Sequence, residues 1–206
     1  MLTAKQNMHE VVFNGKPDRY VNQYEAMQLL ISPAMMLGAS AKKGEGQVVN
    51  AWGVTYEWPE GTPGGFPVHT KDKIVVQDIE HWQDYVKAPS LDVPDQLWEI
   101  CQGMYAAVDG EKAYKACMIA PGMFEQSHHL CSIDLALEYY MTNPDEMHDL
   151  YKMLTDWELS YAEQIVKYLK PDGLFHHDDW GSQLSTFMAP DMFEEFVLPC
   201  YQQIYG

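Results

Sequence analysis

The sequence predicts an α/β protein in which βα units build a parallel sheet. In the second half of the chain, helical and extended patterns alternate as helix, strand, helix, strand and helix. That order and spacing are typical of parallel strands joined by helical crossovers. A complete (β/α)₈ barrel has eight strands and typically about 250 residues. We expect about four strands here, so this chain would contain about half of the strands of such a barrel.

The first half of the chain is less regular. Residues 20–25 are a candidate for a short first strand. Residues 47–58 are rich in β-branched and aromatic side chains, which favours extended chain. The glycine- and proline-rich stretch that follows, 59–67 (PEGTPGGFP), predicts a loop.

The second half begins with a helix that has clear boundaries. An apolar helical pattern opens at Pro94 and closes at Gly110, as expected for proline in a first turn and glycine past the end. A strand is expected over 113–120. Pro121-Gly122 ends that strand, and a helical stretch then runs to about Met141.

The remaining elements follow the same logic. Residues 143–146 (NPDE) combine a capping asparagine, a first-turn proline and two acids that favour the positive end of a helix dipole. The long helix they start ends at 170–173 (KPDG). A short strand is expected over 174–178, and then a last helix that Pro190 opens and Pro199 kinks.

Composition narrows the function classes. The chain has 206 residues and a formal net charge of −17, which argues against binding nucleic acid or an anionic membrane. Its 47% hydrophobic residues are enough for a sizeable core. No secretory signal and no window of about 20 apolar residues is evident, so we expect a cytoplasmic protein. The four cysteines form no CxxC pair and are expected to be buried, reduced thiols.

Candidate functional residues follow two predicted strands. Residues 121–129 contain His128 and His129, and residues 176–183 begin with two histidines and two aspartates. Functional groups in parallel α/β folds gather at such carboxyl ends. Imidazoles beside carboxylates can ligate a metal, transfer protons near neutral pH or hydrogen-bond a polar substrate.

The pairing of these residues is left open by the sequence. On a strand, His176 and Asp178 share one face while His177 and Asp179 share the other, so one pair at most faces a lumen. A metal site normally needs three or four converging ligands, and we assign none. The alternative is that one of the two aspartates binds turn amides or caps the next segment.

Four further residues have two interpretations each. His128 and His129 lie about 100° apart on a helix, so we expect one at most to face a site while the other faces core or solvent. Glu25 is either an inward acid at the end of a first strand or a solvated glutamate at a helix start. Trp180 is either a stacking lid or a packing residue.

The chain resembles a known family along nearly its whole length. The resemblance rests on residues 1–7 and 15–21, on 52–56 (WGVTY) with 59–64, and above all on 178–183 (DDWGSQ) with Ala189-Pro190 and 193–199. These blocks look like the uroporphyrinogen decarboxylase superfamily. The resemblance implies a (β/α)₈ TIM barrel of the uroporphyrinogen decarboxylase type, with residues 1–206 as the N-terminal part of a single barrel domain and about four βα units.

That superfamily has two main branches with different demands. Uroporphyrinogen decarboxylase acts in haem biosynthesis without a cofactor. It binds substrate carboxylates through an arginine-rich N-terminal motif, and an aspartate faces the pyrrole nitrogens of the substrate. Methyltransferases of the other branch move methyl groups to or from a corrinoid protein, commonly with zinc. Here 21–26 contain no arginine, and 50–53 (NAWG) stand where the aspartate is expected. His128 falls where the decarboxylase has a catalytic tyrosine, and Asp179 where it has a serine.

These departures resemble the methyltransferase branch. Its zinc ligands belong to a His-x-Cys motif and a later cysteine in the second half of the barrel, so we expect them beyond this chain and assign no metal ligand here. The resemblance implies a corrinoid carried by a partner protein. It also leads us to expect a truncated or split barrel, completed by another chain or by self-association.

Three hypotheses for function result. The first is a corrinoid-dependent methyltransferase acting on a methylated small molecule or a corrinoid protein, the second a uroporphyrinogen decarboxylase relative, and the third a non-catalytic half-barrel that binds a partner. The expected catalytic residues are Asp179, His128 and His177, and the expected substrate-binding residues are Gln183, Asp178, Trp180, His176 and Glu25.

Overall fold

The computed structural model describes residues 1–37 and 40–206. The chain forms two compact units, each built from three separate stretches of sequence. The first unit contains Met1–Met36, Asp92–Ala120 and Ala162–His177, and the second contains Leu37–Leu91, Pro121–Tyr161 and Asp178–Gly206.

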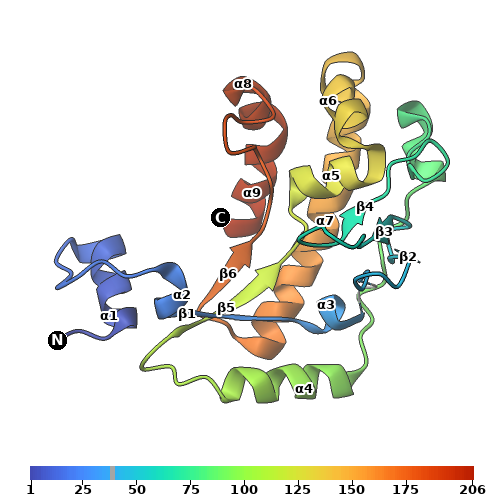
Figure 1. The fold of residues 1–206 in the computed structure, drawn as a ribbon. Coiled ribbons are helices and arrows are strands. Elements are labelled where there is room, and N and C mark those ends of the chain that lie inside the picture. Colours follow the sequence, from blue (N-terminus) through green and yellow to red (C-terminus); the bar gives the residue numbers. More distant parts are fainter. Residues whose placement is uncertain (38–39) are drawn as a thin grey trace. The chain divides into compact units, whose positions relative to one another are not determined.

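A parallel sheet forms the centre of the first unit (Figure 1). Its strands are β1 (Met27–Leu30), β5 (Tyr114–Ile119) and β6 (Gly173–His176), in the order β1-β5-β6. In the register, Leu30 lies opposite Cys117, and Ile119 lies opposite His176. The predicted α/β class with a parallel sheet is therefore confirmed, and the strands predicted over 113–120 and 174–178 lie within two residues of β5 and β6.

The strand predicted over 20–25 is wrong. Asn22 accepts a hydrogen bond from the backbone N–H of Tyr24, and the Glu25 side chain accepts one from the backbone N–H of Asn22. This capping box starts the short helix α2 (Gln23–Ala26), and the strand begins only at Met27. Local capping outweighed the aromatic and β-branched content on which the prediction rested.

Two other helices belong wholly to the first unit. Helix α1 (Ala4–His9) starts in a capping box between Thr3 and Gln6 and continues as a π-helical turn, η1 (Glu10–Asn14). Helix α4 (Asp95–Ala106) has the start that Pro94 predicts and buries Trp98, Cys101 and Tyr105. The short α3 (Pro33–Leu37) follows β1.

The second unit contains antiparallel strands rather than another parallel one. Strands β2 (Gln47–Val49), β3 (Thr55–Glu57) and β4 (Phe66–Pro67) pair in that order. The residues predicted as one extended segment, 47–58, thus form a hairpin. Asn50 makes its turn, because its side-chain oxygen accepts hydrogen bonds from the backbone N–H groups of Trp52 and Val54.

Helices supply most of the core of the second unit. The helical stretch predicted from 123 to about 141 is two helices, α5 (Met123–Cys131) and α6 (Ile133–Thr142), separated by Ser132 at a φ of 73°. The long helix α7 (Pro144–Leu169) has the predicted start and end. The side chains of Phe124, Leu130, Met147, Leu150 and Leu154 are almost completely buried in one apolar cluster.

The C-terminal segment is helical with one irregular turn. Helix α8 (Pro190–Met192) leads through a π-helical turn, η3 (Phe193–Val197), into α9 (Leu198–Tyr205). Pro199 lies in the first turn of α9, where its missing N–H is tolerated. Where the sequence predicted a kink at Pro199, the structure has a π-helical turn that ends two residues before it. Among the described residues, no helix is both long and apolar enough to cross a membrane.

Candidate functional site

Asp178 is the centre of a hydrogen-bond cluster in the second unit. Its Oδ1 accepts from the backbone N–H of Glu125 at 2.7 Å, and its Oδ2 accepts from the backbone N–H of Phe124 at 3.2 Å. Oδ2 also accepts from the Tyr201 hydroxyl at 2.7 Å and from the Trp180 indole N–H at 2.6 Å. The carboxylate therefore caps the first turn of α5, where unpaired N–H groups and the helix dipole favour an anion.

The close approach of this carboxylate depends on Gly122. A Cβ at position 122 would lie 2.4 Å from the Cβ of Asp178 and 2.5 Å from the Tyr201 hydroxyl. Gly122 is the N-cap residue of α5 and brings no capping side chain of its own. Asp178, which lies 53 residues after Glu125, thus takes the place of a local capping side chain. The alternative predicted that one of the two aspartates binds turn amides or caps the next segment. Asp178 does act as a cap, but for the earlier helix α5, so the predicted partner is wrong.

Tyr201 is a hydrogen-bond donor to this cluster. Burial, and then the charge of Asp178, raise the pKa of the Tyr201 hydroxyl far above its ordinary value. The phenol therefore keeps its proton and donates to Asp178. It also accepts the backbone N–H of Met123 at 3.2 Å.

His128 lies on the last turn of α5 with one ring nitrogen buried. Its Nδ1 has no hydrogen-bond partner among the described residues. Burial lowers the pKa of His128 to about 4, and the nearby His69 lowers it further, while Asp178 and Asp179 partly offset both effects. The imidazole is therefore neutral at physiological pH and can accept a hydrogen bond.

His129 is turned into the unit rather than toward solvent. Its Nδ1 lies 2.8 Å from the Tyr56 hydroxyl, and its Nε2 lies 3.8 Å from Oε1 of Glu125. The backbone carbonyl of His129 lies 3.1 Å from Nε2 of His69. The rings of His128 and His129 meet edge to face with centroids 4.8 Å apart. Of the two histidines, His129 is therefore the one that faces the core, and His128 is partly exposed.

The comparison with protein families agrees with these features. Residues 47–206 match the family described as uroporphyrinogen decarboxylase (URO-D). The chain belongs to the uroporphyrinogen decarboxylase family. This stretch includes the Asp178 cluster and both histidines of α5. No curated protein and no solved structure matches the chain. Membership of this family is therefore shown, without a choice between its branches.

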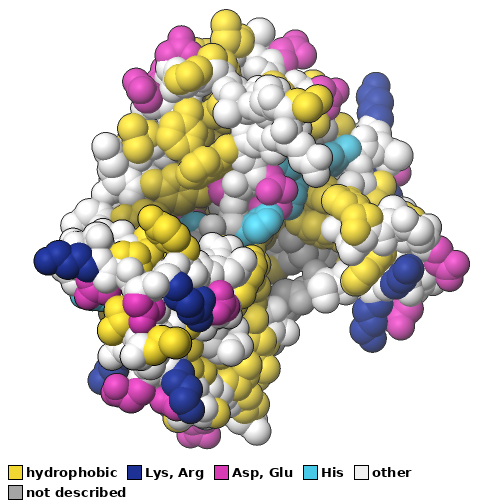
Figure 2. Space-filling model, turned by 60° about the vertical axis from the view of Figure 1, so that its left-hand side comes forward, with side chains coloured by type: hydrophobic (Ala, Val, Ile, Leu, Met, Phe, Trp, Pro, Cys, Tyr) yellow, Lys and Arg dark blue, Asp and Glu magenta, His cyan; other side chains and the backbone are white. Residues whose placement is uncertain are grey.

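Three other residues that the sequence predicted for the site, Asp179, Trp180 and Gln183, lie in the loop after Asp178. Asp179 and Gln183 are exposed, and Asp179 acts on His128 through its charge. Trp180 packs its ring edge to face against Phe193 and Tyr201 while remaining 41% exposed. One part of the Trp180 ring therefore packs against neighbouring side chains, and another part is accessible to solvent. Histidine and acidic side chains lie beside one another on the face shown in Figure 2.

Three predicted residues belong to the first unit. His176 ends β6, and the backbone N–H of His177 donates to the carbonyl of Ile119 at 3.0 Å. Because β6 ends at His176, strand alternation does not extend to Asp178 and Asp179, so the predicted pairing of faces is wrong. Glu25 is exposed in the capping box of α2, and its Oε2 lies 2.9 Å from an Arg19 guanidinium nitrogen. The second interpretation of Glu25, a glutamate at a helix start, is confirmed.

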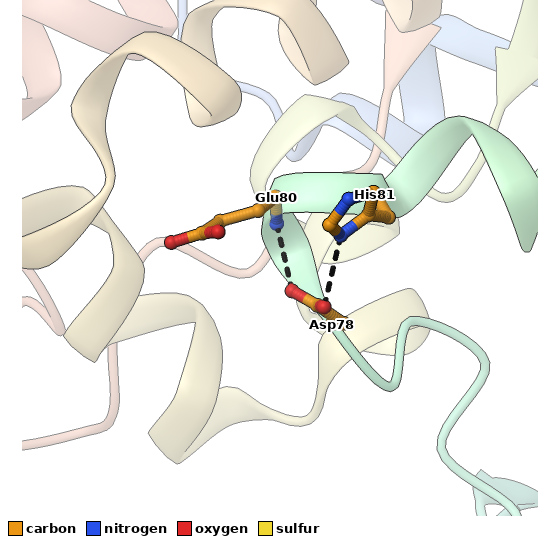
Figure 3. Close-up of side chains that lie close together, drawn as sticks. All are labelled: Asp78, Glu80 and His81. Atoms are coloured by element: carbon orange, nitrogen blue, oxygen red, sulfur yellow. Dashed lines mark hydrogen bonds and ion pairs between the residues drawn. The ribbon is translucent and has the colours of Figure 1, made fainter.

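The zinc of the methyltransferase branch has no matching donor set here. Over residues 1–37 and 40–206, the group close enough to hold an ion is Asp78, Glu80 and His81 (Figure 3). All three are exposed, and Asp78 is already used as the N-cap of η2 (Ile79–Asp84), accepting from the Glu80 backbone N–H and lying 3.0 Å from His81 Nδ1. The four cysteines are buried thiols outside this group. These residues do not fit a thiolate-containing zinc site.

Sequence reasoning missed Tyr56, His69, Glu125 and Tyr201. Tyr56 lies on β3 and is 73 residues from His129, and Tyr201 lies 23 residues after Asp178. Tyr56, His69 and Tyr201 follow no predicted strand end, and the predicted parallel fold gave no reason to place β3 beside α5. Glu125 lies in the segment 121–129 after a predicted strand, where the two histidines were the stronger candidates. Because Tyr56 and Tyr201 are distant in sequence from their partners, no local pattern links them.

Proposed function

We propose that this chain is the N-terminal part of a corrinoid-dependent methyltransferase of the family, which transfers a methyl group between a small molecule and a corrinoid protein. The proposal is supported mainly by His128. Its imidazole is neutral, and its buried Nδ1 has no hydrogen-bond partner in the described part of the chain. The charges nearest to it that favour its protonation are those of Asp178 and Asp179.

This electrostatic setting supports a polar substrate without several negative charges. A neutral imidazole accepts a hydrogen bond from a substrate O–H or N–H, whereas two carboxylates oppose the binding of a polycarboxylate. The net charge of −17 acts in the same direction at longer range. Uroporphyrinogen is a poor match for such a site.

The roles of the two aspartates differ in this proposal. Asp178 accepts four hydrogen bonds from within the chain, so we assign it to positioning α5. Asp179 is exposed and near enough to influence the charge of His128, so we assign it to orienting substrate or exchanging a proton with it. Gln183 and Trp180 remain proposed substrate-binding residues. In the first unit, His177 remains a proposed catalytic residue and His176 a proposed substrate-binding residue, whereas Glu25 is used by the capping box of α2 and by its pair with Arg19.

The metal and the corrinoid enter this proposal in different ways. Zinc has no role assigned to the described residues of this chain, because they do not fit a thiolate-containing zinc site. The corrinoid is carried by the partner protein and is part of the second substrate.

The decarboxylase alternative is disfavoured by the turn at Asn50. Residues 50–53 (NAWG) stand where the decarboxylase is expected to have an acid that faces the pyrrole nitrogens. Asn50 has the one side-chain acceptor of this stretch, and its oxygen is occupied by the N–H groups of Trp52 and Val54. It therefore has a structural partner set of its own. An oxygen engaged in two turn hydrogen bonds is poorly suited to receive pyrrole N–H groups.

We also propose that the sheet belongs to a larger (β/α)₈ barrel. Among the described strands, β1 and β6 each pair on one side only, with β5 between them. Open edges of a parallel sheet favour addition of further strands. Another chain or a second copy of this one is the proposed source, and a non-catalytic half-barrel is the corresponding alternative.

The test compares two reactions in the same preparation. The chain is purified with any protein that co-purifies stably, and methyl transfer from methoxylated or methylated compounds to a corrinoid protein is followed by the cobalamin absorbance. Decarboxylation of uroporphyrinogen without added metal is measured in parallel. Methyl transfer that falls in His128→Gln supports the proposal. Decarboxylation alone would establish the alternative, and corrinoid-protein binding without either reaction would establish the interaction module.

A further inference from the structure

Tyr56 and His129 form a buried contact between a strand and a helix of the second unit. The Tyr56 hydroxyl on β3 lies 2.8 Å from Nδ1 of His129 on α5, and the two rings meet edge to face with centroids 5.6 Å apart. His129 is only 7% exposed.

The direction of the hydrogen bond follows from the charge on the other side of the His129 ring. Nε2 of His129 faces Oε1 of Glu125 at 3.8 Å, and because a carboxylate oxygen only accepts, this contact favours the neutral ring with its proton on Nε2. Nδ1 of His129 is then the acceptor and the Tyr56 hydroxyl is the donor. Burial, and then the charge of Glu125, raise the pKa of the Tyr56 hydroxyl well above its ordinary value, so the phenol keeps the proton that it donates.

The groups around His129 hold both its ring and its backbone. Glu125 lies one turn earlier on α5 and faces Nε2, while His69 approaches the backbone carbonyl of His129 with its Nε2 at 3.1 Å. His128 completes the set, with its ring edge to face against that of His129. His129 is thus held by Tyr56 of β3 at its ring and by His69 at its backbone carbonyl. It lies directly beside His128, which we assign to substrate binding.

We propose that His129 is a positioning residue for His128, held by the Tyr56 hydroxyl as the Nε2–H tautomer. The proposal rests on the proposed function for its effect on turnover, but the tautomer itself does not. With Nδ1 accepting from Tyr56, the ring of His129 presents a fixed face to His128. That contact defines the orientation of the His128 imidazole at the end of α5.

The first measurement is the tautomer. Long-range ¹H–¹⁵N correlation NMR on the ¹⁵N-histidine-labelled full chain separates the two neutral tautomers and the cation, and loss of signals in His129→Gln and His128→Gln assigns the two rings. We expect His129 as Nε2–H in the wild type and a mixture of states in Tyr56→Phe. The matched control is Tyr85→Phe, which removes an exposed hydroxyl of the same unit and leaves the His129 signals unchanged.

Two results would overturn the proposal. One is a wild-type His129 protonated on Nδ1 at neutral pH. The other is a Tyr56→Phe protein whose His129 and His128 signals both match the wild type. Because Tyr56→Phe removes a single oxygen atom, it is expected to fold, and its circular dichroism is compared with that of Tyr85→Phe.

The second measurement is turnover in the methyl-transfer assay. We expect Tyr56→Phe to lower kcat about 10-fold with KM changed by less than about 2-fold, as for loss of alignment rather than binding. If the tautomer is as proposed but no variant or wild type transfers methyl groups, the positioning of His128 stands and the proposed function fails. If methyl transfer occurs and Tyr56→Phe leaves both kcat and the tautomer unchanged, the positioning role fails alone.

Discussion

The Oδ1 atom of Asp178 accepts a hydrogen bond of 2.7 Å from the backbone N–H of Glu125. This contact joins the loop after β6 to the first turn of α5, whose last turn carries His128 and His129. Tyr201 donates to the same carboxylate from α9. One side chain thus links the candidate binding residues to the C-terminal helix of the same unit.

Replacement of Asp178 by asparagine should destabilise the protein. The variant loses a charged acceptor for two helix N–H groups and places an amide N–H₂ near other donors. We expect the free energy of unfolding to fall by about 2–4 kcal/mol, as for loss of a charged cap with several partners. Urea denaturation followed by circular dichroism measures it. Asp179→Asn removes the same charge from an exposed neighbour and should change stability by less than about 0.5 kcal/mol. Equal midpoints for the two variants would refute the capping role.

Gly122 should not tolerate even one added methyl group. In Gly122→Ala, the new Cβ meets the Cβ of Asp178 at 2.4 Å, so the carboxylate must withdraw from α5. We expect a loss of about 1–3 kcal/mol, typical of overpacking. The control is Gly103→Ala in α4, where nothing lies within 4 Å of the new Cβ and the helix should gain about 0.5–1 kcal/mol. Thermal unfolding of both variants should therefore shift in opposite directions, and a shared direction would contradict the steric argument.

The sequence predicted elements well where proline, glycine and capping residues mark the ends. The starts of α4 and α7 follow from Pro94 and Pro144, since proline favours the beginning of a helix, whereas α4 ends at Ala106 rather than at the predicted Gly110. The strand over 20–25 failed because a capping box with Asn22 and Glu25 competes with extended chain in the same residues. Local signals of this kind are visible in sequence, but their relative strength is not.

The candidate site was predicted only in its sequence-local part. Clusters of histidine and aspartate marked 121–129 and 176–183, and the Asp178 contacts with Phe124 and Glu125 confirm that these clusters meet. Tyr56 could not be found in this way, because its link to His129 spans 73 residues and depends on a hairpin that the periodicity did not indicate. Long-range partners of this kind are set by tertiary packing.

Stability should fall in mild acid because His128 is held neutral. The pKa of His128 in the folded chain is about 4, below the ordinary value of 6.5, so the unfolded chain binds a proton first as pH falls. The stabilising effect is complete above about pH 6.5 and is lost between there and about pH 4, for at most roughly 3 kcal/mol. We expect His128→Gln to flatten the pH dependence of the free energy of unfolding over this interval. Parallel curves for wild type and variant would show that His128 titrates normally.

Asp179 is the residue whose charge should matter for turnover rather than for folding. Its carboxylate acts on His128 while remaining exposed, so Asp179→Asn keeps the size of the side chain and removes the interaction. In the methyl-transfer assay we expect kcat/KM to fall at least ~10-fold, equivalent to roughly 1.4 kcal/mol of transition-state stabilisation. Glu194→Gln, an equal charge change at an exposed position on η3, should keep wild-type kinetics and so controls for net charge. Wild-type kinetics in Asp179→Asn would remove Asp179 from the site and leave His128 as its main polar group.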